Sequence, residues 1–372
     1  MCTVLERLSM IEDSRRGWGN FRHPLDEILF IALCAIIAGL TGFEEMSLFG
    51  QQRQEWFKKY LPLKNGIPSE STFERVFAAL KPTELEKFYQ SWALSLRQEA
   101  NGEHLRIDGK TICGASSAAQ KVHMVSAWLS ESGLCLGQLR TNEKSNEITT
   151  IPELLDMLDI SGCVVTIDAM GCQKEIAKKI CSKKGDYILA VKENQPTLLS
   201  DIRQYFRWLD EEHPPDIPYD RCKASLEKGH GRIERRSVEV CKIENWPDMS
   251  KAWKNVGSIV RYDCERIIGE EVSRSTRYYI SSLSDCSAEK MLGYLRSHWS
   301  IENQLHWMLD VTMKEDSCQV RKNNAAENLN RIRKMALSLL RKTPTAKKLS
   351  AKSKTFLAVS DMTFLELVLF GF

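Results

Sequence analysis

The sequence predicts an α/β protein with a mixed β-sheet covered by helices, preceded by a helical segment and interrupted by a β-rich insertion. Residues 24–97 carry apolar residues at helical spacing, and three short apolar runs after residue 101 are typical of successive strands. A strand–helix–strand pattern follows, and long helical patterns return after residue 288. This order of elements favours a mixed sheet with helices on it.

The N-terminal part of the chain, residues 1–100, is predicted to be a helical domain. Its helices are expected at residues 24–40, 44–60 and 82–99. Ser71–Glu74 predicts a capping box at the start of a further helix. A helix, a turn and a capped helix bearing Arg75 could form a DNA-reading unit, and simple helical packing explains the same pattern equally well.

The rest of the chain, residues 101–372, is predicted to hold the sheet. Strands are expected at residues 104–112, 123–130, 135–140, 163–168 and 186–192, with helices at 151–158 and 173–184. The β-rich insertion spans about 196–285 and is expected to contain one helix and three alternating strands. Two long helices, 288–312 and 325–340, complete the prediction.

Composition excludes several classes of protein. The 372 residues are 43% hydrophobic, which argues against disorder, and the 12 cysteines contain no CxxC pair. Scattered thiols and the absence of a secretory pattern in Met1–Met10 predict a cytoplasmic protein. The longest apolar run, Ile28–Leu40, is shorter than the ~20 residues that a membrane span needs, so no membrane partner is expected.

Positive charge is concentrated in a basic C-terminal segment, residues 321–354. This segment has eleven Lys or Arg residues and one acid, so its net charge is +10, whereas the whole chain has +3. Such a block attracts polyanions. Apolar residues at helical spacing would anchor one helix face and leave Arg331, Arg333 and Lys334 as candidate DNA contacts. A solvated helical face, or a tail that maintains solubility, is the alternative.

Three acids are candidates for catalysis. Asp108 ends the run LRID, Asp168 ends the run VVTID, and Glu302 lies in the helical stretch HWSIENQLHW. Carboxylates at strand ends open into the crevice where ligands bind, and hard oxygen ligands suit Mg²⁺ or Mn²⁺. Two such ions can activate a nucleophile and stabilise the leaving oxygen of a phosphodiester. Alternatively, Asp108 is a turn residue, Asp168 a cap, and Glu302 an ion-pair partner of a nearby histidine.

Other reaction classes have less support. The GKT sequence at residues 109–111 lacks the first glycine of a phosphate-binding loop, and no GxSxG, HExxH or strand-borne GxGxxG occurs.

A set of motifs runs in order from about residue 22 to residue 340. They include HPLDEILFIALCAIIAG, NGIPSESTFERVF, LRIDGKTI, VVTIDAMGCQ, DYILAVKENQP and HWSIENQLHWMLDVTMKED. Together they resemble the bacterial insertion-sequence DDE transposases, specifically the H-repeat-associated group with an N-terminal DDE-transposase-associated domain.

The resemblance implies a ribonuclease-H-like catalytic core in which Asp108, Asp168 and Glu302 are the DDE triad and bind two Mg²⁺ or Mn²⁺ ions. It implies binding to terminal inverted repeats, DNA cleavage and joining of 3′ ends to target DNA. The expected partner is double-stranded DNA, with a homodimer once two ends are synapsed, in the bacterial cytoplasm at the nucleoid. Further candidate DNA contacts are Lys110, Lys192, Asn194 and Gln195.

The chain departs from one pattern of these enzymes. Many relatives carry Tyr-x2-Arg-x3-Glu-x6-Lys around the glutamate, and here those positions hold Leu295, His298 and Leu309. The hairpin-handling roles of that Tyr, Arg and Lys are therefore not assigned to these three positions. Two alternative functions stay open, namely a catalytically inactive DNA-binding protein derived from a transposase and a ribonuclease-H-like nuclease without strand transfer.

Overall fold

The computed structural model describes residues 4–13, 15, 21–97, 102–113, 122–129, 131–141, 146–212, 219–223, 226–229, 231–243 and 247–371. These residues form two compact units. The first unit comprises residues 1–98, 109–144 and 302–372, and the second comprises 99–108 and 145–301. Strand β1 (His104–Thr111) contains one of the boundaries.

The first unit is mainly helical. It contains α1 (Val4–Leu8), α2 (Leu25–Ile37), α3 (Phe43–Gln52), α4 (Gln54–Phe57), α5 (Glu70–Ala79), α6 (Pro82–Leu96), α12 (Ala325–Lys342), α13 (Ala351–Ser360) and α14 (Met362–Phe370). Strands β2 (His123–Leu129) and β3 (Leu134–Thr141) form an antiparallel hairpin in it. Two π-helical segments, Glu302–His306 and Met308–Thr312, also belong to it.

Helices α2 and α12 form the core of the first unit. Residues 28–37 are all fully buried, because the uninterrupted apolar run leaves no polar face. Helix α12 packs against α2, α5 and α6, and its residues 325–340 are all buried. The helices predicted at 24–40, 82–99 and 325–340 correspond to α2, α6 and α12, whereas the one predicted at 44–60 is divided at Arg53 into α3 and α4. The predicted capping box is wrong, because α5 begins at Glu70 with Ser69 at its N-cap.

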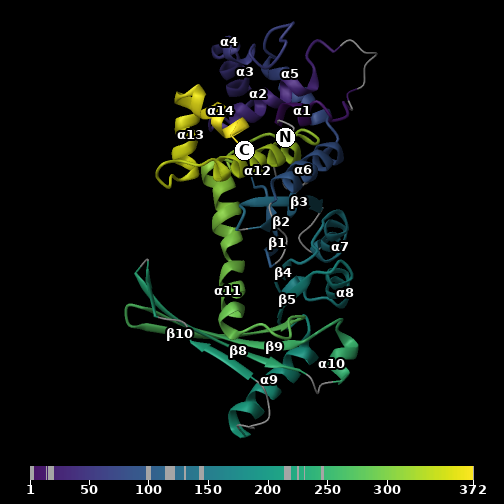
Figure 1. Ribbon diagram of the computed structural model, residues 1–372, viewed down its shortest axis with the longest axis vertical. Coiled ribbons are helices and arrows are strands. Elements are labelled where there is room, and N and C mark those ends of the chain that lie inside the picture. The colour runs from purple at the N-terminus through teal and green to yellow at the C-terminus, as the bar shows by residue number, and fades with distance from the viewer. Residues whose placement is uncertain are drawn as a thin grey trace. The chain divides into compact units, whose positions relative to one another are not determined.

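The second unit contains a mixed sheet, as predicted (Figure 1). Strands β1, β4 (Val164–Ile167) and β5 (Asp186–Val191) are parallel neighbours. Strand β10 (Glu271–Ser281) pairs antiparallel with β5 and is followed in the sheet by β9 (Ser258–Ile268), β8 (Arg232–Lys242) and β6 (Tyr219–Lys223). The short β7 (Glu227–Gly229) pairs with β8.

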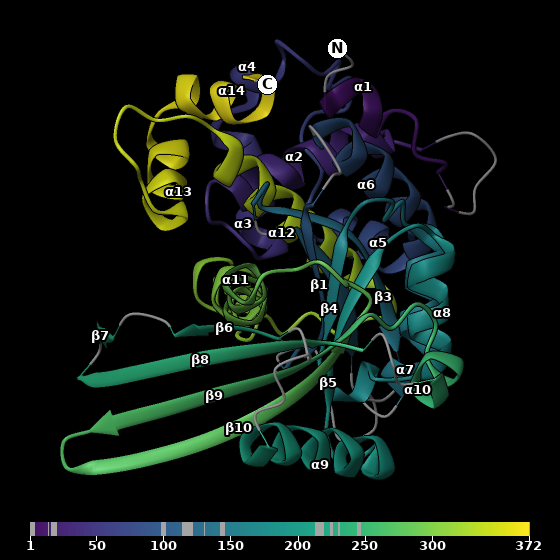
Figure 2. The same ribbon diagram turned by 60° about the horizontal axis from the view of Figure 1, so that its bottom comes forward.

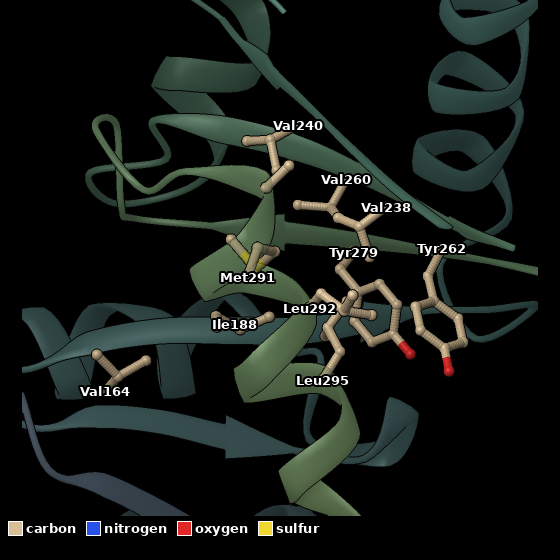
Figure 3. Packing of buried hydrophobic residues seen from close by; sticks show 11 residues of the cluster. Val164, Ile188, Val238, Val240, Val260, Tyr262, Tyr279, Met291, Leu292 and Leu295 are labelled. Carbon is tan, nitrogen blue, oxygen red and sulfur yellow. The ribbon is translucent and has the colours of Figure 1, made fainter. Parts of the chain in front are cut away.

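Helices cover this sheet on both faces. In Figure 1, α11 (Ala288–His298) lies on one side of β4 and β5, and α7 (Glu147–Met157) and α8 (Lys174–Ser182) lie on the other. Helix α9 (Pro196–Glu212) lies along β10, and the short α10 is Pro247–Ala252 (Figure 2). Figure 3 shows Met291, Leu292 and Leu295 of α11 packed among valines of β8 and β9. Among the described residues, no helix combines the length and the apolar character needed to cross a membrane.

Candidate active site

Two of the predicted acids lie side by side in the second unit. Strands β1 and β4 pair in parallel register up to Ile107 and Ile167, and Asp108 and Asp168 are the next residues of each strand. Asp168 therefore stands at the carboxyl end of β4, where α/β folds place ligands. Asp108 lies beside it at the point where β1 stops pairing with β4, although β1 itself continues to Thr111. Each is partly exposed, in contrast to the buried strand residues before it.

The face of the sheet that carries these acids follows from strand alternation. His104 of β1 hydrogen-bonds the Ser297 hydroxyl of α11 at 2.8 Å, and Thr166 of β4 bonds His298 of α11 at 2.9 Å. Side chains two or four residues further along a strand point the same way. Asp108 and Asp168 therefore lie on the face that α11 covers.

A tight turn fixes the orientation of Asp168. The residue precedes the 3₁₀ turn Ala169–Gly171, and its Oδ1 accepts hydrogen bonds from the amides of Met170 at 3.0 Å and Gly171 at 3.4 Å. Among the described residues, Oδ2 accepts no hydrogen bond, which leaves it for another ligand. A Cβ at Gly171 would stand 2.2 Å from Ile167 Cγ2, so the turn requires glycine here.

The segment after β5 holds this turn from a second direction. The side-chain amide of Asn194 donates to the Ala169 carbonyl at 2.7 Å, and that of Gln195 donates to the Cys172 carbonyl at 2.9 Å. Lys192 is exposed at the carboxyl end of β5, beside the ends of β1 and β4. The structure thus gives Asn194 and Gln195 a positioning role that the sequence did not suggest.

The surroundings of Asp168 disfavour its charge. Burial raises the pKa of the Asp168 carboxyl, and the carboxylate of Glu147 in α7 raises that pKa further. The amides of Gly171 and Met170 and the ammonium of Lys192 act in the opposite direction. Glu147 is itself buried, with 4% of its surface exposed, on a helix that packs against the Asp168 turn. A positively charged ligand at Asp168 would relieve this accumulation of negative charge.

A neutral histidine pair joins the strands to α11. The Thr166 hydroxyl lies 2.7 Å from His104 Nε2 and 2.9 Å from His298 Nδ1. Burial lowers the pKa of His104 to about 2 and that of His298 to about 4, and Arg106 contributes in both cases. Both rings are therefore uncharged at neutral pH. His104 is buried and His298 is half-buried, and both are internal contacts between the strands and α11.

The third predicted acid, Glu302, falls in the first unit. It is exposed and is the first residue of the π-helical segment Glu302–His306. The predicted helix 288–312 is thus present but changes to π-helical hydrogen bonding at Glu302, a feature frequent at functional sites. The meeting of Glu302 with Asp108 and Asp168 stays a prediction.

The donor atoms at the strand ends suit a hard divalent cation. Asp108 and Asp168 offer carboxylate oxygens, as Mg²⁺ and Mn²⁺ prefer. Within the described ranges, no group of three or more His, Cys, Asp or Glu side chains is gathered closely enough to hold a metal ion. The two aspartates alone therefore do not make up a complete metal site among the described residues.

The basic side chains of α12 do not form the predicted exposed surface. Arg331, Arg333 and Lys334 have 2%, 1% and 1% of their surface exposed. Arg331 Nε donates to Glu86 Oε2 at 2.7 Å, and burial lowers the pKa of Lys334. The prediction that these three residues contact DNA is wrong, because their partners come from sequence-distant elements that helical periodicity cannot reveal.

Lys110 also has partners within the protein. Its ammonium lies 2.6 Å from Asp310, 3.1 Å from Glu315 and 3.5 Å from Asp316, all in the first unit. Although burial acts against it, the carboxylates of Glu315 and Asp310 raise the pKa of Lys110. Its charge is therefore already compensated, and we do not retain Lys110 among the proposed DNA contacts.

Comparison with known proteins agrees with this arrangement. Residues 100–339 match the family described as Transposase DDE domain, and residues 5–93 match the DDE_Tnp_1-associated family. The chain belongs to the DDE transposase family. A ribonuclease-H-like fold is the fold of this family, and the mixed sheet with helices on both faces agrees with it.

Relatives of this DDE transposase extend over the whole chain. It is 38% identical to "H repeat-associated putative transposase YhhI" of Escherichia coli K12, covering 99% of this chain and 98% of that protein. It is 41% identical to "Putative transposase YncI" of Escherichia coli O157:H7, covering 91% and 87%. The predicted H-repeat-associated group is thereby confirmed.

Two further comparisons concern an inactive protein and a solved structure. The "Inactive transposase YbfQ" of Escherichia coli K12 is 35% identical over 80 residues, which are 22% of this chain and 94% of that protein. A piggyBac transposase synaptic complex with hairpin DNA aligns over 99% of this chain and 77% of its own, with 12% identity and a TM-score of 0.44. That similarity is too distant to bear on the site.

Proposed function

We propose that this DDE transposase binds the terminal inverted repeats of an insertion sequence, cleaves the DNA there and joins the 3′ ends to target DNA. The observation that carries the proposal is that Asp108 and Asp168 directly follow the paired residues of the adjacent parallel strands β1 and β4. The family normally uses divalent metal ions, and these two side chains have the donor chemistry for them.

In this proposal Asp108, Asp168 and Glu302 hold two Mg²⁺ or Mn²⁺ ions. The ions would activate the attacking oxygen and stabilise the leaving oxygen of the phosphodiester. The Asp168 turn keeps one carboxylate oxygen on backbone amides and presents the other. His298 bonds α11 to β4, and Glu302, four residues later in the sequence, is the proposed third ligand.

The DNA in this proposal is double-stranded and comprises element ends and target. Lys192 at the end of β5 is the proposed phosphate contact nearest the acids, with Asn194 and Gln195 beside it. We assign DNA binding to the N-terminal domain, residues 1–100, and end positioning to the insertion at about 196–285 of the catalytic domain, residues 101–372. A homodimer would synapse two ends at the nucleoid, in the bacterial cytoplasm.

The test uses a supercoiled plasmid carrying the DNA that flanks this gene, incubated with protein and Mg²⁺ or Mn²⁺. We expect metal-dependent nicks at the element ends and covalent joining of 3′ ends to a second duplex. Asp108→Asn should bind the same DNA and leave it uncut. Equal cleavage by wild type and Asp108→Asn would contradict the assigned role of Asp108.

The two alternatives give different products in the same assay. Binding of the ends without cleavage in either metal identifies a catalytically inactive DNA-binding protein. Cleavage that never inserts a 3′ end into the second duplex identifies a ribonuclease-H-like nuclease.

A further inference from the structure

The first unit contains a basic cavity formed by α5 and the segments before it. The cavity has a volume of about 590 Å³. Its polar lining consists of Arg15, Arg22, His23, Asn65, Ser69, Thr72 and Arg75. Among the described residues that line it, none is acidic.

Helix α5 contributes one face and its N-terminus. Ser69, Thr72 and Arg75 are three residues apart, so they follow one another along the same face of the helix. The Ser69 side chain does not cap the helix; its Oγ lies 3.2 Å from Ser71 Oγ and 3.1 Å from Thr72 Oγ1. The first amides of α5, at the positive end of its dipole, therefore lack a side-chain cap.

His23 gives an independent indication of a ligand. It lines the cavity with 7% of its surface exposed, and its Nδ1 is buried without a hydrogen-bond partner among the described residues. Burial lowers the pKa of His23, and Arg22 and Arg15 lower it further. A buried polar atom without a partner costs about 1–3 kcal/mol. A hydrogen-bonding ligand in the cavity would remove that cost.

The arginines of the cavity differ in whether a carboxylate neutralises their charge. Arg15 is paired with Asp13 at 2.5 Å and donates to the His23 carbonyl at 3.1 Å, so it is held rigidly. Arg75 donates to the Ser71 carbonyl at 3.1 Å and has no carboxylate partner among the described residues. Arg22 is exposed, and its side chain has no ion pair with any described residue. The cavity therefore carries about two uncompensated positive charges.

From this geometry we infer that the cavity binds a phosphate group of the DNA backbone, held by Arg22, Arg75 and the N-terminus of α5. Guanidinium groups and uncapped helix amides are the usual phosphate ligands in proteins. The inference rests on the proposed function, because DNA is the source of the phosphate. It assigns to the N-terminal segment a phosphate contact separate from the catalytic acids.

The test measures binding of a short duplex by fluorescence anisotropy at several salt concentrations, with full-length protein. Arg22→Gln and Arg75→Gln should each weaken binding about tenfold and reduce the slope of log affinity against log salt by about 1. Lys87→Gln is the matched control, because Lys87 is an exposed cation on α6 whose partner is Glu84 at 3.0 Å. It should change neither quantity. Inorganic phosphate should compete more strongly against wild type than against Arg75→Gln.

Several outcomes overturn the inference. The inference is wrong if Arg75→Gln, like Lys87→Gln, changes neither the DNA affinity nor its salt dependence. Binding of inorganic phosphate by the wild type, with unchanged DNA affinity in both arginine variants, would make the cavity a small-anion site. These results are distinct from failure of the proposed function. Asp108→Asn should bind DNA like wild type, whereas a wild type that neither binds nor cuts DNA would contradict the proposed function itself.

Discussion

Acidification should destabilise the second unit through the neutral pair His104 and His298. The folded pKa values of His104 and His298 are about 2 and about 4, against an ordinary value of 6.5. The unfolded chain therefore binds more protons than the folded chain below pH 6.5. The histidines' contribution to stability is fully present above that pH and is lost as the pH falls toward 4.

The size of the effect follows from these values. Between pH 7 and pH 5 each histidine should lower the free energy of unfolding by about 2 kcal/mol, and the pair by about 4 kcal/mol. The variant His298→Gln removes one titrating ring, so its loss of stability over the same pH interval should be smaller than that of wild type by about 2 kcal/mol. Urea unfolding at pH 7 and pH 5, followed by tryptophan fluorescence, measures the difference.

Thr166→Val is the matched control, since Thr166 bonds both rings but does not titrate. It should lower stability by about 1–3 kcal/mol at both pH values and leave the pH dependence unchanged. If His298→Gln retained the full pH dependence of wild type, the assignment of a neutral His298 with a lowered pKa would be refuted.

Three further predictions concern the site and the buried ion pairs. Gly171→Ala should displace the turn after β4, because the added Cβ would meet Ile167. DNA cleavage should therefore fall strongly, while circular dichroism stays close to wild type. Asn194→Ala removes a 2.7 Å hydrogen bond to that turn, and should lower kcat with little change in DNA affinity; a change in affinity alone would instead indicate a direct DNA contact. Arg331→Ala should cost about 3–5 kcal/mol in urea unfolding, because Glu86 loses its buried partner; an unchanged unfolding midpoint would contradict the buried pair.

The sequence predicted the strand end at Asp168 because the pattern there is local: an apolar run that ends in aspartate marks the end of β4 at Ile167. The run that ends at Asp108 does not mark the end of its strand, because β1 continues to Thr111. The sequence predicted a mixed sheet, but it did not predict which strands of that sheet are neighbours. The structure supplies the register that sets the two carboxylates side by side.

The residues whose roles the sequence did not predict make contacts with other parts of the chain, which a local sequence pattern cannot reveal. Helix α12 was predicted correctly as a helix, but Arg331 is buried against Glu86, which is 245 residues away in the sequence, and Arg333 is buried near Glu315, which lies outside the helix. The same holds for Asn194, whose side chain supports a turn 25 residues earlier. The exposed edge strand β6 was missed because Tyr219–Lys223 lacks the apolar alternation of the other strands.

We propose that Asp108, Asp168 and Glu302 meet around the same metal ions. Iron-generated hydroxyl radicals test this directly, because Fe²⁺ in a magnesium site cuts the nearby backbone in the presence of ascorbate. We expect cuts near residues 108, 168 and 302 that excess Mg²⁺ suppresses and Asp108→Asn abolishes. Cuts confined to the neighbourhood of 108 and 168, or none that Mg²⁺ suppresses, would contradict it.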